Sequence, residues 1–256
     1  MKEQVLAADT LAQIEDVYLP YRPKRRTRAT AAREKGLESL AQSIFEQDDT
    51  VPMAAAESYI NTEKGVESVE EALAGARDII AEWINEDQQA RAAMRLMFEK
   101  EAIVRSKVIK DMEAQGAKYR DYFEWEEPIA TAPSHRVLAI RRGENEKILS
   151  LSIAPSQDKA TTILEKQFVK GATPAAEQVK LAVEDSYHRL LSLSMETEIR
   201  TLSKLRADAE AIKVFAENLR ELLLMSPLGS RRIMALDPGF RSGCKMVCLD
   251  EQGALL

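Results

Sequence analysis

Apolar residues recur at three- and four-residue steps along most of this chain, which is the pattern of amphipathic helices. The pattern predicts helices over 3–18, 27–35, 37–47, 68–85, 87–110, 134–143, 158–169 and 174–225. Pro52 suits the first turn of one further short helix. The helix over 87–110 is expected to break, if anywhere, near 105–106. Between the first two helices, Pro20 and Pro23 predict an extended segment.

Several helix ends are marked by local residues. Ser68 and Glu71 have the spacing of a capping box, and Ser134 is a candidate N-cap. Gly36 and Gly143 are expected to end the helices that precede them.

The longest predicted helix, 174–225, opens at Thr173-Pro174 and carries an apolar seam. Its steps alternate between three and four residues, close to a coiled-coil repeat. The seam consists of Leu191, Met195, Leu202, Leu205, Ala209, Ile212, Ala216, Leu219 and Leu223. A bend is expected near 193–194, so this element should pack along a helical body.

Three parts of the chain break the helical pattern. Apolar residues alternate with serines over 148–153, which predicts a strand, and 116–133 is expected to be an aromatic-rich connector. Residues 233–250 predict two strands around a Gly-rich turn, a hairpin that would place Asp237 opposite Cys244. Because two strands alone are marginally stable, this hairpin is expected to open a domain of which the chain holds only the start.

These elements together predict a mainly α fold. A multi-helix body over 1–229, with a minor strand element, would be followed over 230–256 by a truncated β-hairpin that opens a further domain. The composition agrees, because the chain is rich in helix-forming residues and 45% hydrophobic, enough for a sizeable core. It has no apolar run near the roughly 20 residues that span a bilayer, and no signal-peptide core. Cys244 and Cys248 would lie about 13 Å apart on a strand, too far for a disulfide, so a cytoplasmic protein is expected.

Charge changes this picture in one place. The net charge of −6 argues against a protein coated with nucleic acid, yet 22–35 contain seven Arg or Lys and one Glu, whereas 38–101 are acidic. A basic segment held extended by prolines can follow phosphates, with Arg making bidentate contacts and Tyr stacking on a base. The candidate nucleic-acid-binding residues are Tyr21, Arg22, Lys24, Arg25, Arg26 and Arg28. The alternative is an internal role, in which this segment docks on the acidic stretch.

Several separate motifs resemble the Tex family of bacterial transcription accessory proteins. They are LPYRPKRRTRATAAREKGL at 19–37, residues 105–108, GAKYRDYF at 116–123, PSHR at 133–136 and LDPGFRSGCK at 236–245. They occur in the family's order, and the resemblance covers essentially the whole chain. It implies a cytoplasmic protein that binds RNA or DNA and is related to a eukaryotic transcription elongation factor. The transcription machinery is a candidate partner, and no membrane association is implied.

Proteins of this family are much longer than this chain. The resemblance implies a helical N-terminal region, a YqgF-type RNase H-like domain, helix-hairpin-helix elements and a C-terminal OB-fold that binds RNA. This chain would hold the latter part of the helical region and the first hairpin of the YqgF-type domain.

Catalysis by this chain is not expected. RNase H-like nucleases hold two metal ions roughly 3.5–4 Å apart with carboxylates from several elements. Asp237 matches only the first-strand position of the YqgF motif, which makes it a vestigial catalytic candidate. In the predicted hairpin Asp250 would lie about 20 Å away and is better interpreted as a turn residue. The expected function is a nucleic-acid-binding scaffold without chemistry, cofactor or metal of its own.

Three alternatives remain open at this point. One is a metal-dependent nuclease of the Holliday-junction-resolvase type, which needs further carboxylates from later strands. Another is a protein-docking module that uses the acidic face of 38–101. The weakest is an actin-like ATPase fold, in which turn amides and Lys245 would meet phosphate.

Other polar and aromatic clusters are expected to be structural. His135 and His188 have no local partners for nucleophilic catalysis, and the two cysteines lack zinc-ligand spacing. A second basic cluster, Arg136, Arg141 and Arg142, fits a solvated helix face, with a phosphate contact as the alternative. The connector aromatics are expected to pack between helices rather than stack on bases. They are Tyr119, Tyr122, Phe123 and Trp125.

Overall fold

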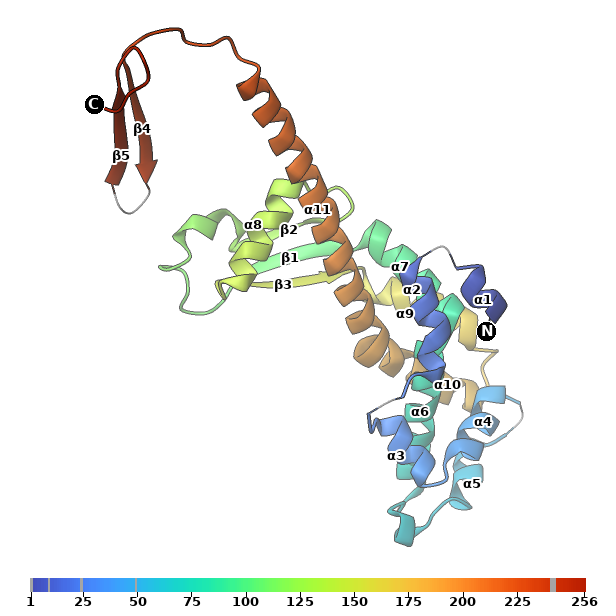
Figure 1. The fold of residues 1–256 in the computed structure, drawn as a ribbon. Coiled ribbons are helices and arrows are strands. Elements are labelled where there is room, and N and C mark those ends of the chain that lie inside the picture. The colour runs from blue at the N-terminus through green and yellow to red at the C-terminus, as the bar shows by residue number, and fades with distance from the viewer. Residues whose placement is uncertain (1, 9, 24, 49, 240–242) are drawn as a thin grey trace. The chain divides into compact units, whose positions relative to one another are not determined.

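The computed structural model describes residues 2–8, 10–23, 25–48, 50–239 and 243–256. The chain forms two compact units, Met1–Ala209 and Glu210–Leu256. Helices dominate, and the described strands form one three-stranded and one two-stranded sheet, which confirms the mainly α prediction (Figure 1). Within the described residues, no helix is both long and apolar enough to cross a membrane.

The N-terminal helix is divided where the sequence pattern predicted one continuous element. Helix α1 (Lys2–Leu6) ends before Thr10, and α2 (Leu11–Tyr18) begins after it. The hydroxyl of Thr10 accepts from the Gln13 amide, and the Gln13 side chain accepts from the Thr10 amide, which forms a capping box. The segment after α2 is also not fully extended, because Pro20 lies in the 3₁₀ helix η1 (Leu19–Tyr21).

The next helices form a bundle around α6 (Val69–Glu86), close to their predicted bounds. Helices α3 (Arg28–Glu34), α4 (Glu38–Glu46) and α5 (Pro52–Glu57) pack against α6, and α7 (Gln88–Glu101) follows it (Figure 1). The predicted cap at Ser68 is confirmed, since its hydroxyl accepts from the Glu71 amide. Gly75 of α6 allows close packing, because a Cβ there would lie 2.4 Å from Cδ1 of the buried Leu37.

The predicted helix over 87–110 is wrong beyond residue 101. There β1 (Ile103–Val108) forms the centre of a sheet ordered β2-β1-β3, with antiparallel partners β2 (Glu124–Pro128) and β3 (Leu149–Ala154). Pairing on both sides satisfies the backbone of a segment rich in β-branched residues, which overrides its helical pattern. The strand predicted over 148–153 is confirmed as β3. The 3₁₀ helix η3 (Ala117–Tyr122) fills the connector.

Helix α8 (Ser134–Asn145) covers one face of this sheet (Figure 1). Two predictions about its ends are wrong. The N-cap is Pro133 rather than Ser134, which is the first helical residue. Gly143 does not end the helix, which continues to Asn145. Gly143 instead lies against β3, where a Cβ would come within 2.6 Å of Cδ1 of Leu149.

The remaining helices run from α9 (Gln157–Phe168) through α10 (Pro174–Ser186) to α11 (Ser192–Leu223). The break predicted near 193–194 is misplaced, because these residues lie in the first turn of α11; the helical irregularity is the π-helical segment η4 (Tyr187–Leu191) that precedes α11. Thr173 caps α10 by accepting from the Ala176 amide.

The apolar seam predicted for α11 is only partly correct. Met195 is buried as expected, but Leu202 and Leu205 are 42% and 60% exposed. The buried stripe follows four-residue steps instead, through Met195, Ile199, Ser203 and Ala207. Ser203 and Ala207 are small and let α11 approach the rest of the larger unit closely. The predicted seam, built from larger apolar residues, did not include them.

The smaller unit contains the predicted hairpin, β4 (Ile233–Gly239) and β5 (Gly243–Leu249). Its register differs from the prediction, because Asp237 pairs with Lys245 and not with Cys244. Three residues rather than two separate the strands. The predicted turn at 240–241 lies outside the described residues. The prediction for Asp250 is confirmed, since its carboxylate accepts from the amides of Gln252 and Ala254 in a turn.

Candidate nucleic-acid interface

The basic segment, residues 21–28, crosses from η1 into α3 on the surface of the larger unit. Tyr21 ends η1 with 63% of its surface exposed. Arg22, Arg25, Arg26 and Arg28 are all exposed. Lys24, the remaining predicted binding residue, lies outside the described residues. The segment thus presents an aromatic ring and four guanidinium groups along a short stretch of surface.

The N-terminal end of the basic segment is anchored through Asp16 of α2. Asp16 is 4% exposed and accepts hydrogen bonds from Nε of Arg91 and, at 2.7 Å, from Nη2 of Arg95. Arg95 also pairs with Glu198 of α11. Burial alone would lower the pKa of Arg95, but its hydrogen bonds to Glu198 and Asp16 outweigh burial and raise it. Helix α2 is therefore fixed to α7 and α11 immediately before the segment begins.

The C-terminal end is anchored at Thr27, the N-cap of α3. Its hydroxyl accepts from the Thr30 amide at 3.0 Å and donates to the carboxylate of Glu82 at 3.1 Å. Arg33 donates to the same carboxylate at 2.5 Å and also pairs with Glu38. Burial alone would lower the pKa of Arg33, but these glutamates outweigh burial and raise it. The internal role predicted as an alternative therefore holds for Arg33.

The other charges of the basic segment are not used in this way. Arg26 pairs with Glu34, but both side chains are mostly exposed, so the pair contributes little. Among the residues that the structure describes, Arg22, Arg25 and Arg28 form no ion pair. Arg28 lies within electrostatic reach of Asp78 on α6. The structure thus leaves Arg22 and Arg25 facing solvent between the two fixed ends and Arg28 facing solvent just after the second.

Asp237, the vestigial catalytic candidate, lies on β4 of the smaller unit and is exposed. Its partner across the hairpin is Lys245, a cation rather than a second carboxylate. Across the described ranges, no three His, Cys, Asp or Glu side chains are placed to hold a metal ion.

The second basic cluster is mostly paired with neighbouring acids. Arg136 pairs with Glu127 at 3.0 Å, and Arg141 pairs with Glu144 at 2.9 Å. Arg142 is exposed. Arg136 thus links α8 to β2, Arg141 is paired within α8, and the cluster is not a free basic patch.

The connector aromatics contact protein side chains. Tyr119 is 4% exposed, and Tyr122 meets Trp125 edge-on with ring centroids 5.7 Å apart. Both histidines are exposed, and Nε2 of His188 lies 2.7 Å from the Gln157 amide nitrogen. Packing is therefore the role that the structure assigns to these aromatics.

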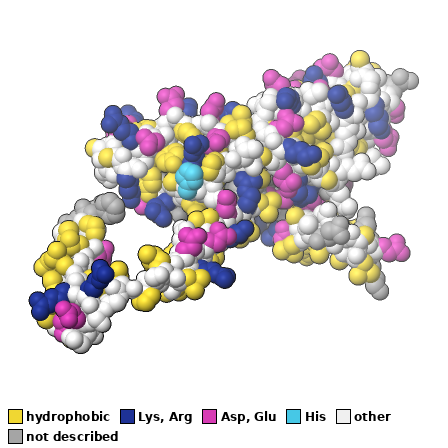
Figure 2. Space-filling model, turned by 90° about the horizontal axis from the view of Figure 1, so that it is seen from above, with side chains coloured by type: hydrophobic (Ala, Val, Ile, Leu, Met, Phe, Trp, Pro, Cys, Tyr) yellow, Lys and Arg dark blue, Asp and Glu magenta, His cyan; other side chains and the backbone are white. Residues whose placement is uncertain are grey.

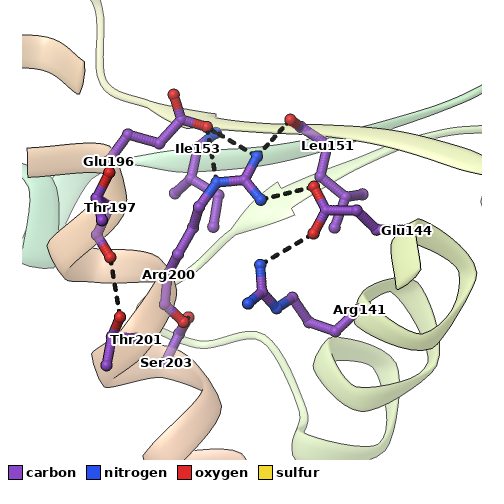
Figure 3. Close-up of polar contacts among 9 residues, drawn as sticks. All are labelled: Arg141, Glu144, Leu151, Ile153, Glu196, Thr197, Arg200, Thr201 and Ser203. Atoms are coloured by element: carbon purple, nitrogen blue, oxygen red, sulfur yellow. Dashed lines mark hydrogen bonds and ion pairs between the residues drawn. The ribbon is translucent and has the colours of Figure 1, made fainter. Parts of the chain in front are cut away.

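Sequence analysis did not identify Arg200, which organises the polar contacts between α11, β3 and α8 (Figure 3). Arg200 donates to the carbonyl of Leu151 at 2.5 Å and pairs with Glu144 at 2.7 Å and with Glu196 at 3.0 Å. Glu196 in turn accepts from the Ile153 amide at 2.9 Å. The only local indication was the four-residue spacing of Glu196 and Arg200, which is common on exposed helices.

Figure 2 shows how charged side chains are distributed on one face of the molecule. On the face shown, Lys and Arg side chains lie among Asp, Glu and hydrophobic ones rather than forming a continuous basic area. Electrostatic binding of nucleic acid scales with the number of phosphates neutralised. A contact made by the basic segment would therefore be short, because the segment carries few cations.

Comparisons with known proteins agree with the motifs. A family model described as Tex central region-like matches residues 47–215. Protein YdcI of Bacillus subtilis is 42% identical over 260 residues, covering 100% of this chain and 36% of its own length. The transcriptional accessory protein Tex of Neisseria gonorrhoeae is 35% identical over 262 residues, covering 100% and 34%. Human S1 RNA-binding domain-containing protein 1 is 27% identical over 269 residues, covering 98% and 26%. This chain spans about a third of the length of the two bacterial relatives.

Proposed function

The chain belongs to the Tex family, and on that premise we propose that it is the helical scaffold of a transcription accessory factor that contacts RNA or DNA. One observation carries the proposal to this chain: Arg22 and Arg25 face solvent between two anchored ends, and Arg28 faces solvent directly after the second. The names of two relatives support a nucleic-acid role, one as a transcriptional accessory protein and one for its S1 RNA-binding domain. Its proposed partners are RNA or DNA with the transcription machinery, in the cytoplasm.

The proposed mechanism is positioning. Guanidinium groups bind phosphate oxygens bidentately, and an exposed aromatic ring can stack on an unpaired base. Because Asp16 and Thr27 fix the two ends of the basic segment, the bound strand would take a defined direction along the helical body. The helical body would then hold the RNase H-like and RNA-binding modules of the full-length protein in a fixed relation to that strand.

We also propose that this chain performs no chemistry of its own. The two aspartates of the hairpin have different surroundings, since Asp237 lies opposite Lys245 in the strand register and the Asp250 carboxylate accepts from turn amides. A two-metal nuclease needs carboxylates that converge on one site. This arrangement favours a structural role for both residues.

A salt series tests the proposal. Binding of a fluorescein-labelled single-stranded RNA is followed by anisotropy for the chain and for the triple variant Arg22→Ala, Arg25→Ala, Arg28→Ala. Each phosphate contact contributes about 0.7 to the slope of log affinity against log salt for single strands, so the variant should lose a slope of about 2. Tyr21→Ala should weaken binding without changing the slope, because stacking carries no charge.

A matched triple variant controls for net charge. Lys100, Lys110 and Lys166 are exposed and lie outside the basic segment. Changing these three to Ala removes the same charge and should leave affinity within about twofold, because long-range charge is screened beyond about 10 Å at ordinary salt. If the control loses as much affinity as the segment variant, or if the segment variant binds as tightly as the original chain, the basic segment is not the contact.

A further inference from the structure

A different kind of surface lies on α5, on the side that faces away from α6. Pro52 and Ala56 of α5 are buried, whereas Val51 and Met53 are 55% and 59% exposed. Ile60, in the turn that follows α5, is 42% exposed. Single exposed apolar residues are ordinary on protein surfaces. Three such large side chains within ten residues, on α5 and directly beside it, make an exposed apolar surface, which we call the α5 face.

The sequence on both sides of α5 is mostly acidic. Between residues 37 and 75 the chain has nine Asp or Glu and one Lys. Glu46 at the end of α4, Glu57 on α5 and Glu63 after it are exposed and form no ion pair among the described residues. Helices α4 and α5 lie side by side on α6 (Figure 1).

This chain's own basic segment does not occupy the α5 face. Its ion pairs go to Glu34, and those of Arg33 go to Glu38 and Glu82 on α4 and α6. The acids near α5 therefore remain available. They also repel nucleic acid, because like charges brought together cost free energy. A partner for this face must supply cations as well as apolar surface.

We infer that the α5 face, formed by Val51, Met53 and Ile60 with Glu46, Glu57 and Glu63 around them, docks an amphipathic helix of a partner protein that carries Lys or Arg beside its apolar stripe. Apolar side chains supply the buried area of such a contact, and the surrounding charges select the partner. Methionine suits this role because its unbranched chain adapts to differently shaped surfaces. The chain would then bind two classes of partner at separate surfaces: phosphates at the basic segment and a basic helix at the α5 face.

Two designed peptides test the inference against the whole 256-residue chain. One is a fluorescein-labelled amphipathic helix of Leu and Lys, and the other has the same Leu pattern with Glu in place of Lys. We expect the Lys peptide to bind in anisotropy titrations and the Glu peptide not to bind. The variants Met53→Ser with Ile60→Ser, and Glu57→Gln with Glu63→Gln, should each weaken the Lys peptide about tenfold, or about 1.4 kcal/mol.

A control pair separates this face from general surface stickiness. Leu96 and Leu181 are 50% and 46% exposed on other helices, and changing both to Ser removes a similar apolar area. This control should bind the Lys peptide like the original chain, and all variants should bind RNA unchanged. Circular dichroism confirms that each variant is folded. Equal binding of the two peptides, no binding of the Lys peptide, or equal losses in the control and the α5 variants would each overturn the inference.

Discussion

Replacing Arg200 by Ala is expected to destabilise the larger unit by freeing the outer edge of β3. In the sheet order β2-β1-β3, β3 has a strand partner on one side only. On its other side, Arg200 donates to the carbonyl of Leu151, and Glu196 accepts from the amide of Ile153 (Figure 3). Unpaired backbone groups at a sheet edge must be covered or solvated. The variant removes the donor that covers this carbonyl and the cation between two glutamates.

The magnitude follows from how exposed the cluster is. Removing one partner of a fully buried charged pair costs roughly 3–5 kcal/mol. Arg200 keeps 20% of its side chain exposed, and Glu144 and Glu196 keep 26% and 23%, so solvent screens part of each interaction. We expect a loss of about 2–3 kcal/mol in the free energy of unfolding. For a chain of this size, Tm should fall by about 4–12 °C.

Urea denaturation followed by circular dichroism measures this loss, with Arg220→Ala as the matched control on an exposed position of the same helix. Arg200→Lys keeps the positive charge but not the planar guanidinium group, so it should recover only part of the stability that Arg200→Ala loses. A double-mutant cycle with Glu144→Gln should give a coupling of about 1 kcal/mol. A loss below about 0.5 kcal/mol in the free energy of unfolding, or full recovery by Lys, would refute the view that the Arg200 guanidinium holds the edge of β3.

Three further changes test other parts of the structure by urea denaturation. Gly143→Ala gains about 1 kcal/mol of helix propensity but places a Cβ 2.6 Å from Leu149, so a net loss of about 1–2 kcal/mol is expected; a net gain would contradict this packing. Burial raises the pKa of Asp78 despite the charge of Arg189, so its ionised form is held less well by the folded chain than by the unfolded one. Asp78→Asn should match or exceed the original stability near pH ~7. This advantage should shrink as pH falls through the Asp78 pKa toward ~4, and an advantage that grows in acid would contradict a raised Asp78 pKa. Thr27→Ala removes the cap of α3 and should cost about 1–2 kcal/mol while weakening RNA binding less than loss of the arginines does; unchanged stability would show that the cap is dispensable.

Local chemistry predicted most of the helices correctly. Ser68 and Thr173 cap the helices that they were expected to open, and Gly36 leaves α3 with a φ of 86°. These features depend on residues within one helical turn, so the sequence displays them directly. Thr10 shows the limit of pattern recognition even at this range, because the apolar stripe continued across a capping box and hid the break.

The errors arise where distant parts of the chain meet. β1 is a strand because β2 and β3 pair with it on both sides, and neither partner adjoins it in sequence. The buried stripe of α11 passes through Ser203 and Ala207, which a search for large apolar residues passes over. At the candidate site, too, the local feature was predictable and the long-range contact was not. Composition identified the basic segment, but Glu82 on α6 decides that Arg33 is internal.

Helix α11 joins the parts of the larger unit that the proposed function must hold together. Glu198 reaches Arg95 and, through it, the helix before the basic segment, whereas Arg200 reaches β3 and α8. Arg206 donates to two carbonyl oxygens just after β2. One helix therefore fixes both the sheet and the start of the basic segment. A flexible basic tail would bind phosphates through charge alone, but it would not set the direction of the bound strand. The two anchors of the segment, more than its charge, thus favour a scaffold over an electrostatic tether.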